Sequence, residues 1–522
     1  MNDVGKMNHN WIGSFLAASV FMLVLKGFCD DTPLHEAAEF GNVELVTSLL
    51  ASNADVNAHG INGWTPLHRV VMVGNTNMAA LLIKHKADVN ARGDNGETPI
   101  YRAIGSAGMI KLLLANGADI NAEDKWHNTV LSGAVGGALN IGADIIPLLL
   151  TNGANAVVLG LDGETPLYQA VLEKNKTIID ELLPYYTNSE GKKRMVTSLA
   201  LAMDERSSDL AQIIFTSAVR LETNLLHRAA IGGDVQAARS LLARHPDSIN
   251  DQGILGWTPL HLAAQSGQTE VAELLLNHAN LDLQDALGNT PLHWAAYFGH
   301  GKVVELLLRH KAKVELKDTI GNRPLDFAVQ ENFLPIAEML VTNGANLNEA
   351  GKWYGQFPLH IAVRNGNVEG VRLLLRHGAN VNSVEINSAT PLDFAIMGDS
   401  PEIVQLLLTN GAGVKTRRGG KSWNMFHFWA LGAGNPSIAD RLLVEGCDPL
   451  AKNSDGQTPL HLAVHQGQQR AVQWLLDHKA DINAKDAHGK TPLSLIVIER
   501  WGRKLELRPE IVKLLIERGA KE

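Results

Sequence analysis

Short blocks of apolar and polar residues recur along most of the chain. A block opens with Thr-Pro-Leu-His and continues through small apolar residues to a glycine about nine positions after the threonine. A run of leucines follows, ending at Asn-Gly-Ala or a similar group. Threonine is a good N-cap, proline suits the first helical position, and glycine ends a helix. Each block therefore predicts two short helices. An Asp-x-x-Gly stretch after them then bends the chain into a hairpin-like finger.

The blocks return at a nearly constant spacing. Thr-Pro-Leu-His begins at positions 32, 65, 258, 290 and 458, close variants begin at 98, 165, 390 and 491, and weaker ones at 129, 197, 224, 323, 357 and 424. The mean step is about 33 residues, a period typical of repeat proteins. One unit of this size cannot bury its own apolar face, so neighbouring units must stack to complete a core.

This motif at this period resembles the ankyrin repeat, and the resemblance covers nearly the whole chain from residue 30. It implies about 13–15 repeats in an all-α repeat fold. The expected architecture is an ankyrin-repeat α-solenoid, a curved and elongated stack of paired antiparallel helices with hairpin-like fingers. The family's usual role, protein–protein interaction, is what the resemblance implies for function.

The rhythm of the repeat breaks in two places. Leu183-Pro184 ends a helix early, and the step from 197 to 224 is short. We therefore expect an amino-terminal stack over 30–183, an irregular joint or degenerate repeat over 184–223, and a carboxy-terminal stack over 224–522. The last unit has extra residues around 500–504, and its charged residues fit the polar capping repeat that the end of a solenoid requires.

The first 29 residues form a separate segment. Residues 12–25 carry no charge, but with Trp11 the apolar run has 15 residues, whereas a bilayer span takes about 20. Small residues Gly27 and Cys29 stand at −3 and −1 before Asp30, as in an export signal. We expect a secreted or periplasmic protein. The alternatives are an uncleaved membrane anchor or a cytoplasmic protein with a wrongly assigned start.

Composition and motif searches exclude most other chemistry. The net charge of −9 argues against a general nucleic-acid binder, and two cysteines exclude a disulfide framework. Arg417-Arg418-Gly419-Gly420-Lys421-Ser422 lacks the first glycine of a phosphate loop. Equivalent histidines of neighbouring repeats lie about 10 Å apart, too far to share a zinc ion, so hydrogen bonding is the expected role of the tetrapeptide histidines. We expect no cofactor, no metal, no catalytic residues and no enzymatic activity.

Binding specificity must come from positions that the repeat leaves free, namely the finger residues and the two residues before the first-helix glycine. Aromatic and large apolar side chains there are candidate anchors for a protein partner. The candidates are Trp64, Met72, Trp126, Trp257, Tyr297, Phe298, Trp353, Tyr354 and Trp423. Other free first-helix pairs include Glu39 with Phe40 and Met72 with Val73. For Trp64, Trp257 and Trp423 the alternative is packing on the adjacent finger.

The leading hypothesis is a monomeric, exported, non-enzymatic scaffold that binds an unidentified protein along its concave face. It predicts no nucleic-acid partner, and no membrane contact beyond the amino-terminal segment. An intracellular or membrane-tethered adaptor is the first alternative. An enzyme with a cryptic site in the 184–223 joint is a remote one.

Overall fold

The computed structural model describes residues 31–136, 144–161, 163–204, 208–220, 224–351, 355–386, 388–414, 423–500, 503–506 and 508–521. Contacts between residues divide the chain into two compact units, with the boundary after Leu221. The predicted export signal at 1–29, the Arg417–Ser422 loop and the candidates Trp353 and Tyr354 lie outside the described residues. The predicted boundaries of the joint at 184–223 stay predictions.

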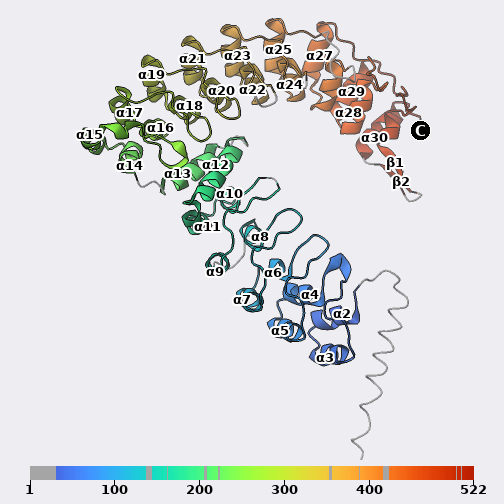
Figure 1. Ribbon diagram of the computed structural model, residues 1–522. Coiled ribbons are helices and arrows are strands. Elements are labelled where there is room, and N and C mark those ends of the chain that lie inside the picture. Colours follow the sequence, from blue (N-terminus) through green and yellow to red (C-terminus); the bar gives the residue numbers. More distant parts are fainter. Residues whose placement is uncertain are drawn as a thin grey trace, which may run out of the picture. The chain divides into compact units, whose positions relative to one another are not determined.

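The first unit consists of helix pairs joined by extended fingers (Figure 1). Its elements are α2 (Pro33–Glu39), α3 (Val43–Ala51), η1 (Ile61–Gly63), α4 (Pro66–Val73), α5 (Thr76–Lys84), α6 (Pro99–Arg102), α7 (Ala107–Ala115), α8 (Val130–Gly136), α9 (Ile145–Thr151), α10 (Pro166–Leu172), α11 (Lys176–Leu182), η2 (Leu183–Tyr186), α12 (Ser189–Asp204) and α13 (Ser208–Arg220). The last two helices are the longest of this unit and pack against each other.

The second unit repeats the helix pair along its whole length (Figure 1). Its elements are α14 (Leu225–Gly232), α15 (Val235–Arg244), η3 (Pro246–Asn250), η4 (Ile254–Gly256), α16 (Pro259–Gln265), α17 (Thr269–Leu276), α18 (Pro291–Tyr297), α19 (Gly301–Arg309), α20 (Pro324–Gln330), α21 (Leu334–Thr342), α22 (Pro358–Arg364), α23 (Val368–Arg376), α24 (Pro391–Met397), α25 (Pro401–Thr409), α26 (Met425–Leu431), α27 (Pro436–Val444), α28 (Pro459–Gln466), α29 (Gln469–Asp477), η5 (Leu493–Leu495), β1 (Val497–Arg500), β2 (Arg503–Glu506) and α30 (Pro509–Glu517).

The helices begin where the tetrapeptide predicts. In α16, Thr258 is the N-cap, Pro259 occupies the first turn, and Thr258 and His261 form a reciprocal capping box. Seven of the described second helices use a different cap, an asparagine, aspartate or serine whose side-chain oxygen accepts a hydrogen bond from a backbone N–H in the first turn. These caps are Asn42, Asn75, Ser106, Asn175, Asp234, Asn367 and Asn435.

The core runs between neighbouring repeats. First helices pack on first helices, as α16 does on α18, and second helices pack on second helices, as α17 does on α19. Small residues such as Ala263 and Ala295 are fully buried at these close approaches, and leucines such as Leu275 and Leu307 fill the second-helix layer. Each repeat therefore depends on its neighbours for its apolar burial, as stacking requires. The predicted ankyrin-repeat α-solenoid fold is confirmed.

Asparagine side chains form a second link between repeats, which we call the asparagine ladder. Each donates from Nδ2 to a backbone carbonyl in the following repeat. Its Oδ1 accepts the backbone N–H of the residue two positions after that carbonyl. Asn90, for example, bonds the oxygen of Gly117 at 2.9 Å and the nitrogen of Asp119 at 2.7 Å. The ladder residues are Asn57, Asn90, Asn121, Asn348, Asn382 and Asn483.

The last repeat departs from the helix pair. After Thr491 the chain forms the turn η5 and then the antiparallel hairpin β1–β2, with Val497 opposite Glu506 and Arg500 opposite Arg503. The hairpin stands where a first helix continues in other repeats. The extra residues noted in the sequence are therefore accommodated by strand pairing, and α30 closes the unit as an ordinary second helix.

Candidate binding surface

The fingers of neighbouring repeats are held together by backbone hydrogen bonds. The N–H of Thr319 donates to the carbonyl of Leu287 at 2.8 Å, and that of Ala286 donates to Leu255 at 2.9 Å. The residue after Leu287 must be a glycine for the Thr319 bond to form. Gly288 has φ +79°, and a Cβ there would lie 2.7 Å from the Thr319 nitrogen. Neighbouring fingers thus form a tied row rather than separate loops.

The tetrapeptide histidines tie each first helix to the next finger. The Thr258 backbone N–H donates to Nδ1 of His261 at 3.1 Å, so the ring proton is on Nε2, which donates to the Asn289 carbonyl at 3.0 Å. His35, His68, His227, His293, His360, His427 and His461 reach the following finger in the same way. Burial lowers the pKa of His261 to about 4 and that of His293 to about 3. These histidines are structural, as the sequence predicts.

Three of the predicted anchors lie in the core. Trp257 and Tyr297 are each 1% exposed, and Trp64 is also buried. The expectation that these side chains are free to contact a partner is corrected, because the residues of neighbouring repeats cover them. For Trp64 and Trp257 the packing alternative is the one that the structure favours.

Two guanidinium groups lie over the ring of Trp64. Arg69 and Arg102 stand 5.2 and 4.7 Å from the centre of its ring, and its Nε1 donates to Glu97 at 2.6 Å. Burial would raise the pKa of Glu97, but the hydrogen bonds from Trp64 and Arg102 and the positive charge of Arg102 outweigh it and lower the pKa. This tryptophan therefore fastens repeats together through a cation–π stack.

Trp257 donates from Nε1 to a buried carboxylate, Asp285, at 3.0 Å. Trp294 of α18 donates to the same carboxylate at 2.8 Å, and the backbone N–H groups of Leu287 and Asn289 donate to its other oxygen. Burial raises the pKa of Asp285 to about 7, although these four donors oppose the rise. Asp285 thus satisfies two buried indoles at once.

The other predicted residues that the structure describes keep part of their surface in solvent. Met72 and Trp126 are about half exposed, at 47% and 49%. Phe298 and Trp423 are partly buried, Phe298 against Trp294 and Tyr297, and Trp423 against His427 and Phe428. Among the predicted anchors within the described ranges, Met72 and Trp126 are therefore the most accessible.

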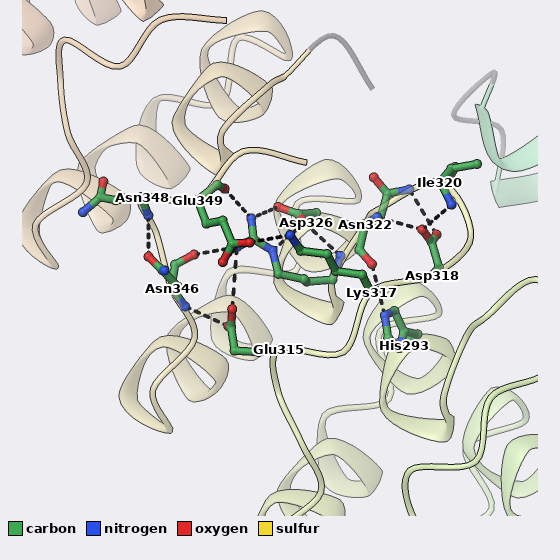
Figure 2. Close-up of polar contacts among 11 residues, drawn as sticks. His293, Glu315, Lys317, Asp318, Ile320, Asn322, Asp326, Asn346, Asn348 and Glu349 are labelled. Atoms are coloured by element: carbon green, nitrogen blue, oxygen red, sulfur yellow. Dashed lines mark hydrogen bonds and ion pairs between the residues drawn. The ribbon is translucent and has the colours of Figure 1, made fainter. Parts of the chain in front are cut away.

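A buried ionic network was not predicted. Arg323 replaces the tetrapeptide threonine and Asp326 replaces the histidine. The guanidinium binds the Asp326 carboxylate at 3.1 Å and the carbonyls of Glu349 and Asn346, in the segment after α21, at 2.6 and 3.2 Å (Figure 2). Burial would lower the pKa of Arg323, but the carboxylates of Asp326, Glu315 and Glu349 outweigh it and raise the pKa. The first helix is thus still tied to the segment after the second helix, with different chemistry.

The exposed apolar side chains mark the accessible surface. Ten of the seventeen large apolar residues exposed in the described parts of the chain stand at first-helix ends or in fingers. These ten are Phe40, Ile61, Met72, Val73, Trp126, Leu161, Leu172, Val384, Ile386 and Met397. Phe40 and Val73 belong to the free pairs read from the sequence, whereas Leu161 and Ile386 were missed because the finger pattern marks turns and not exposure.

The described residues offer neither a metal site nor a membrane-spanning helix. Within those ranges, histidine, cysteine, aspartate and glutamate side chains form no group of three or more that could hold a metal ion. Nor does that part of the chain contain a helix of the length and apolar character needed to cross a bilayer.

Comparison with known families gives a direct match. The family model for ankyrin repeats in three copies matches residues 30–124, 226–318, 277–351, 325–418 and 426–522, more than half of the chain. The chain belongs to the ankyrin repeat family. Repeats of this family are in general non-enzymatic modules that serve as scaffolds for protein binding.

Curated relatives match over shorter stretches. E3 ubiquitin-protein ligase KEG of Arabidopsis thaliana is 35% identical over 121 residues, which make up 23% of this chain and 7% of that protein. The chicken (Gallus gallus) nuclear factor NF-kappa-B p105 subunit is 34% identical over 182 residues, 33% of this chain and 18% of the relative. The matched segments thus span less than a fifth of either relative.

A solved structure is also similar. The crystal structure of the human ASB11 ankyrin repeat domain is 28% identical in sequence and has a TM-score of 0.38. The similarity covers 44% of this chain and all of that domain.

Proposed function

We propose that this protein is an exported, non-enzymatic scaffold that binds a protein partner through its first-helix ends and fingers. One observation carries the proposal. The side chains that define the repeat are buried in contacts within the stack. Most of the exposed large apolar side chains in the described ranges stand instead at positions that the repeat leaves free. Exposed apolar groups of this kind favour protein association.

A matched set of surface variants tests the binding face. Met72→Ser and Trp126→Ser remove exposed side chains from a first-helix end and a finger. Val444→Ser removes an even more exposed side chain from the end of a second helix, α27. We expect partners cross-linked to the wild-type chain to be lost with the first two variants and retained with the third. Equal retention by all three would reject this face.

Export rests on the sequence of the first 29 residues, with its uncharged run at 12–25 and small residues at −3 and −1. Amino-terminal sequencing of the mature protein provides the test. Asp30 as the first residue supports export. An intact Met1 on a cytoplasmic protein contradicts it, and an intact Met1 on a membrane-bound protein supports the tethered adaptor.

A further inference from the structure

The first two repeats carry the most exposed aromatic side chain among the described residues. Phe40, at the carboxyl end of α2, is 84% exposed, and Met72 and Val73, at the end of the neighbouring α4, are about half exposed. Val73 occupies in its tetrapeptide block the position of Phe40 in the preceding block. Because α2 packs on α4, these three side chains stand at the same end of two adjacent helices, and we call them the Phe40 patch.

The surroundings of the Phe40 patch are acidic. Residues 31–76 contain five acidic residues, at positions 31, 36, 39, 44 and 55, and a single basic one, Arg69, so their net charge is −4. Arg69 is itself engaged: it binds Asp31 at 2.8 Å and lies 3.9 Å from the Glu39 carboxylate. Glu36 in the first turn of α2 and Glu44 in that of α3 are exposed. The excess negative charge therefore faces solvent.

We infer that the Phe40 patch binds a segment of a protein partner that combines lysine or arginine with apolar side chains. The inference rests on the proposed scaffold function and specifies its partner. Apolar side chains of the partner would cover Phe40, Met72 and Val73, while its cations would approach Glu36 and Glu39. An acidic surface repels anionic lipids and nucleic acids, so the charge favours a protein segment over either of these.

Peptide display on the immobilised full-length chain tests the inference and does not require an identified partner. We expect the enriched peptides to contain basic and apolar residues and to weaken as salt is raised. Their affinity, measured by fluorescence anisotropy, should fall about tenfold or more with Phe40→Ser and Met72→Ser together. Glu36→Gln with Glu39→Gln should reduce both the affinity and its salt dependence. Val444→Ser, which changes a similarly exposed side chain on α27, should leave the affinity unchanged.

Several results would overturn the inference. Enriched peptides that are acidic or uncharged contradict the chemistry, and peptides that bind the Phe40→Ser variant as well as the wild type contradict the location. In both cases the scaffold function survives, because peptides still bind elsewhere on the chain. Dimerisation abolished by Phe40→Ser would assign the patch to a second copy. No binding in either the display or the cross-linking experiment would reject both proposals.

Discussion

A single imidazole ring performs two tasks in most repeats. Nδ1 of His261 accepts the backbone N–H of its own helix cap, and Nε2 donates to the finger of the next repeat. This arrangement needs the neutral ring, because a second proton on Nδ1 would remove the acceptor. Burial disfavours the charged form as well, which is why the pKa of His261 is lowered.

The lowered pKa values predict a loss of stability in mild acid. Unfolded histidine titrates near 6.5, whereas His261 and His293 titrate near 4 and 3 when folded. The unfolded chain therefore binds more protons as the pH falls below about 6.5, and the free energy of unfolding decreases from there toward the folded pKa values. The raised pKa values of Asp285 (about 7) and Asp318 (about 6) oppose part of this loss, because these carboxyls bind protons in the folded state over the same range. The lowered histidines of the second unit outnumber them, so the urea midpoint of that unit should still fall between pH 7 and pH 5.

Substitution distinguishes the contribution of these histidines to the pH dependence from that of other titrating groups. His261→Gln with His293→Gln keeps a capping box but removes two titrating rings, so the pH dependence of the urea midpoint should become shallower. His245→Gln, which changes an exposed histidine, should leave the dependence as it is in the wild type. A dependence that stays the same in the double variant would assign the acid sensitivity to other residues.

Arg323 and Asp326 show a second solution at the same positions. Removing only the cation by Arg323→Ala should destabilise the second unit by about 3–5 kcal/mol, because Asp326 stays buried without its partner. Arg323→Thr with Asp326→His recreates the pair found at Thr290 and His293, and it should recover most of the loss. Thermal unfolding followed by circular dichroism measures both. Equal stability of Arg323→Ala and wild type would contradict the role of the network.

At the scale of the element, Leu450 is one of the positions that interrupt the asparagine ladder. Leu450 follows Asp448 as Asn483 follows Asp481, and in both places the later backbone N–H donates to the aspartate. Leucine has no side-chain amide, so it cannot make the ladder bonds that Asn483 makes to Gly519 and Lys521. The repeats at this junction are therefore joined by helix packing but lack the link that the ladder asparagines provide elsewhere.

Leu450→Asn should restore the link to the following repeat. The side chain is 44% exposed, so little apolar burial is lost, and two new hydrogen bonds should stabilise the second unit by about 1 kcal/mol. The measurement is the urea midpoint of unfolding. Leu450→Ser, which cannot span the same distance, is the control. A midpoint no higher for asparagine than for serine would contradict the expected ladder bond.

At the scale of the whole molecule, the chain forms two compact units in which each repeat contacts its neighbours. Stability in such a stack is a sum of repeat terms and nearest-neighbour terms. Leu340→Ala in α21 should therefore accelerate amide hydrogen exchange in α19–α23 and leave α2–α7 unchanged. Leu113→Ala in α7 should accelerate exchange in α2–α7 and leave α19–α23 unchanged. Exchange mass spectrometry resolves the segments, and a uniform change along the chain would show a single cooperative unit.

The sequence by itself determined the repeat, the helix starts and the role of the histidines. These features are local: a cap, a turn or a ring bond involves one repeat and the next at a fixed spacing. Only the tertiary structure decided which aromatic residues are accessible. Trp257 is buried because neighbouring repeats supply Asp285 and Trp294 to cover it, whereas the described residues around Phe40 leave that ring exposed. Exposure depends on what adjacent repeats contribute, and the repeat pattern does not encode that.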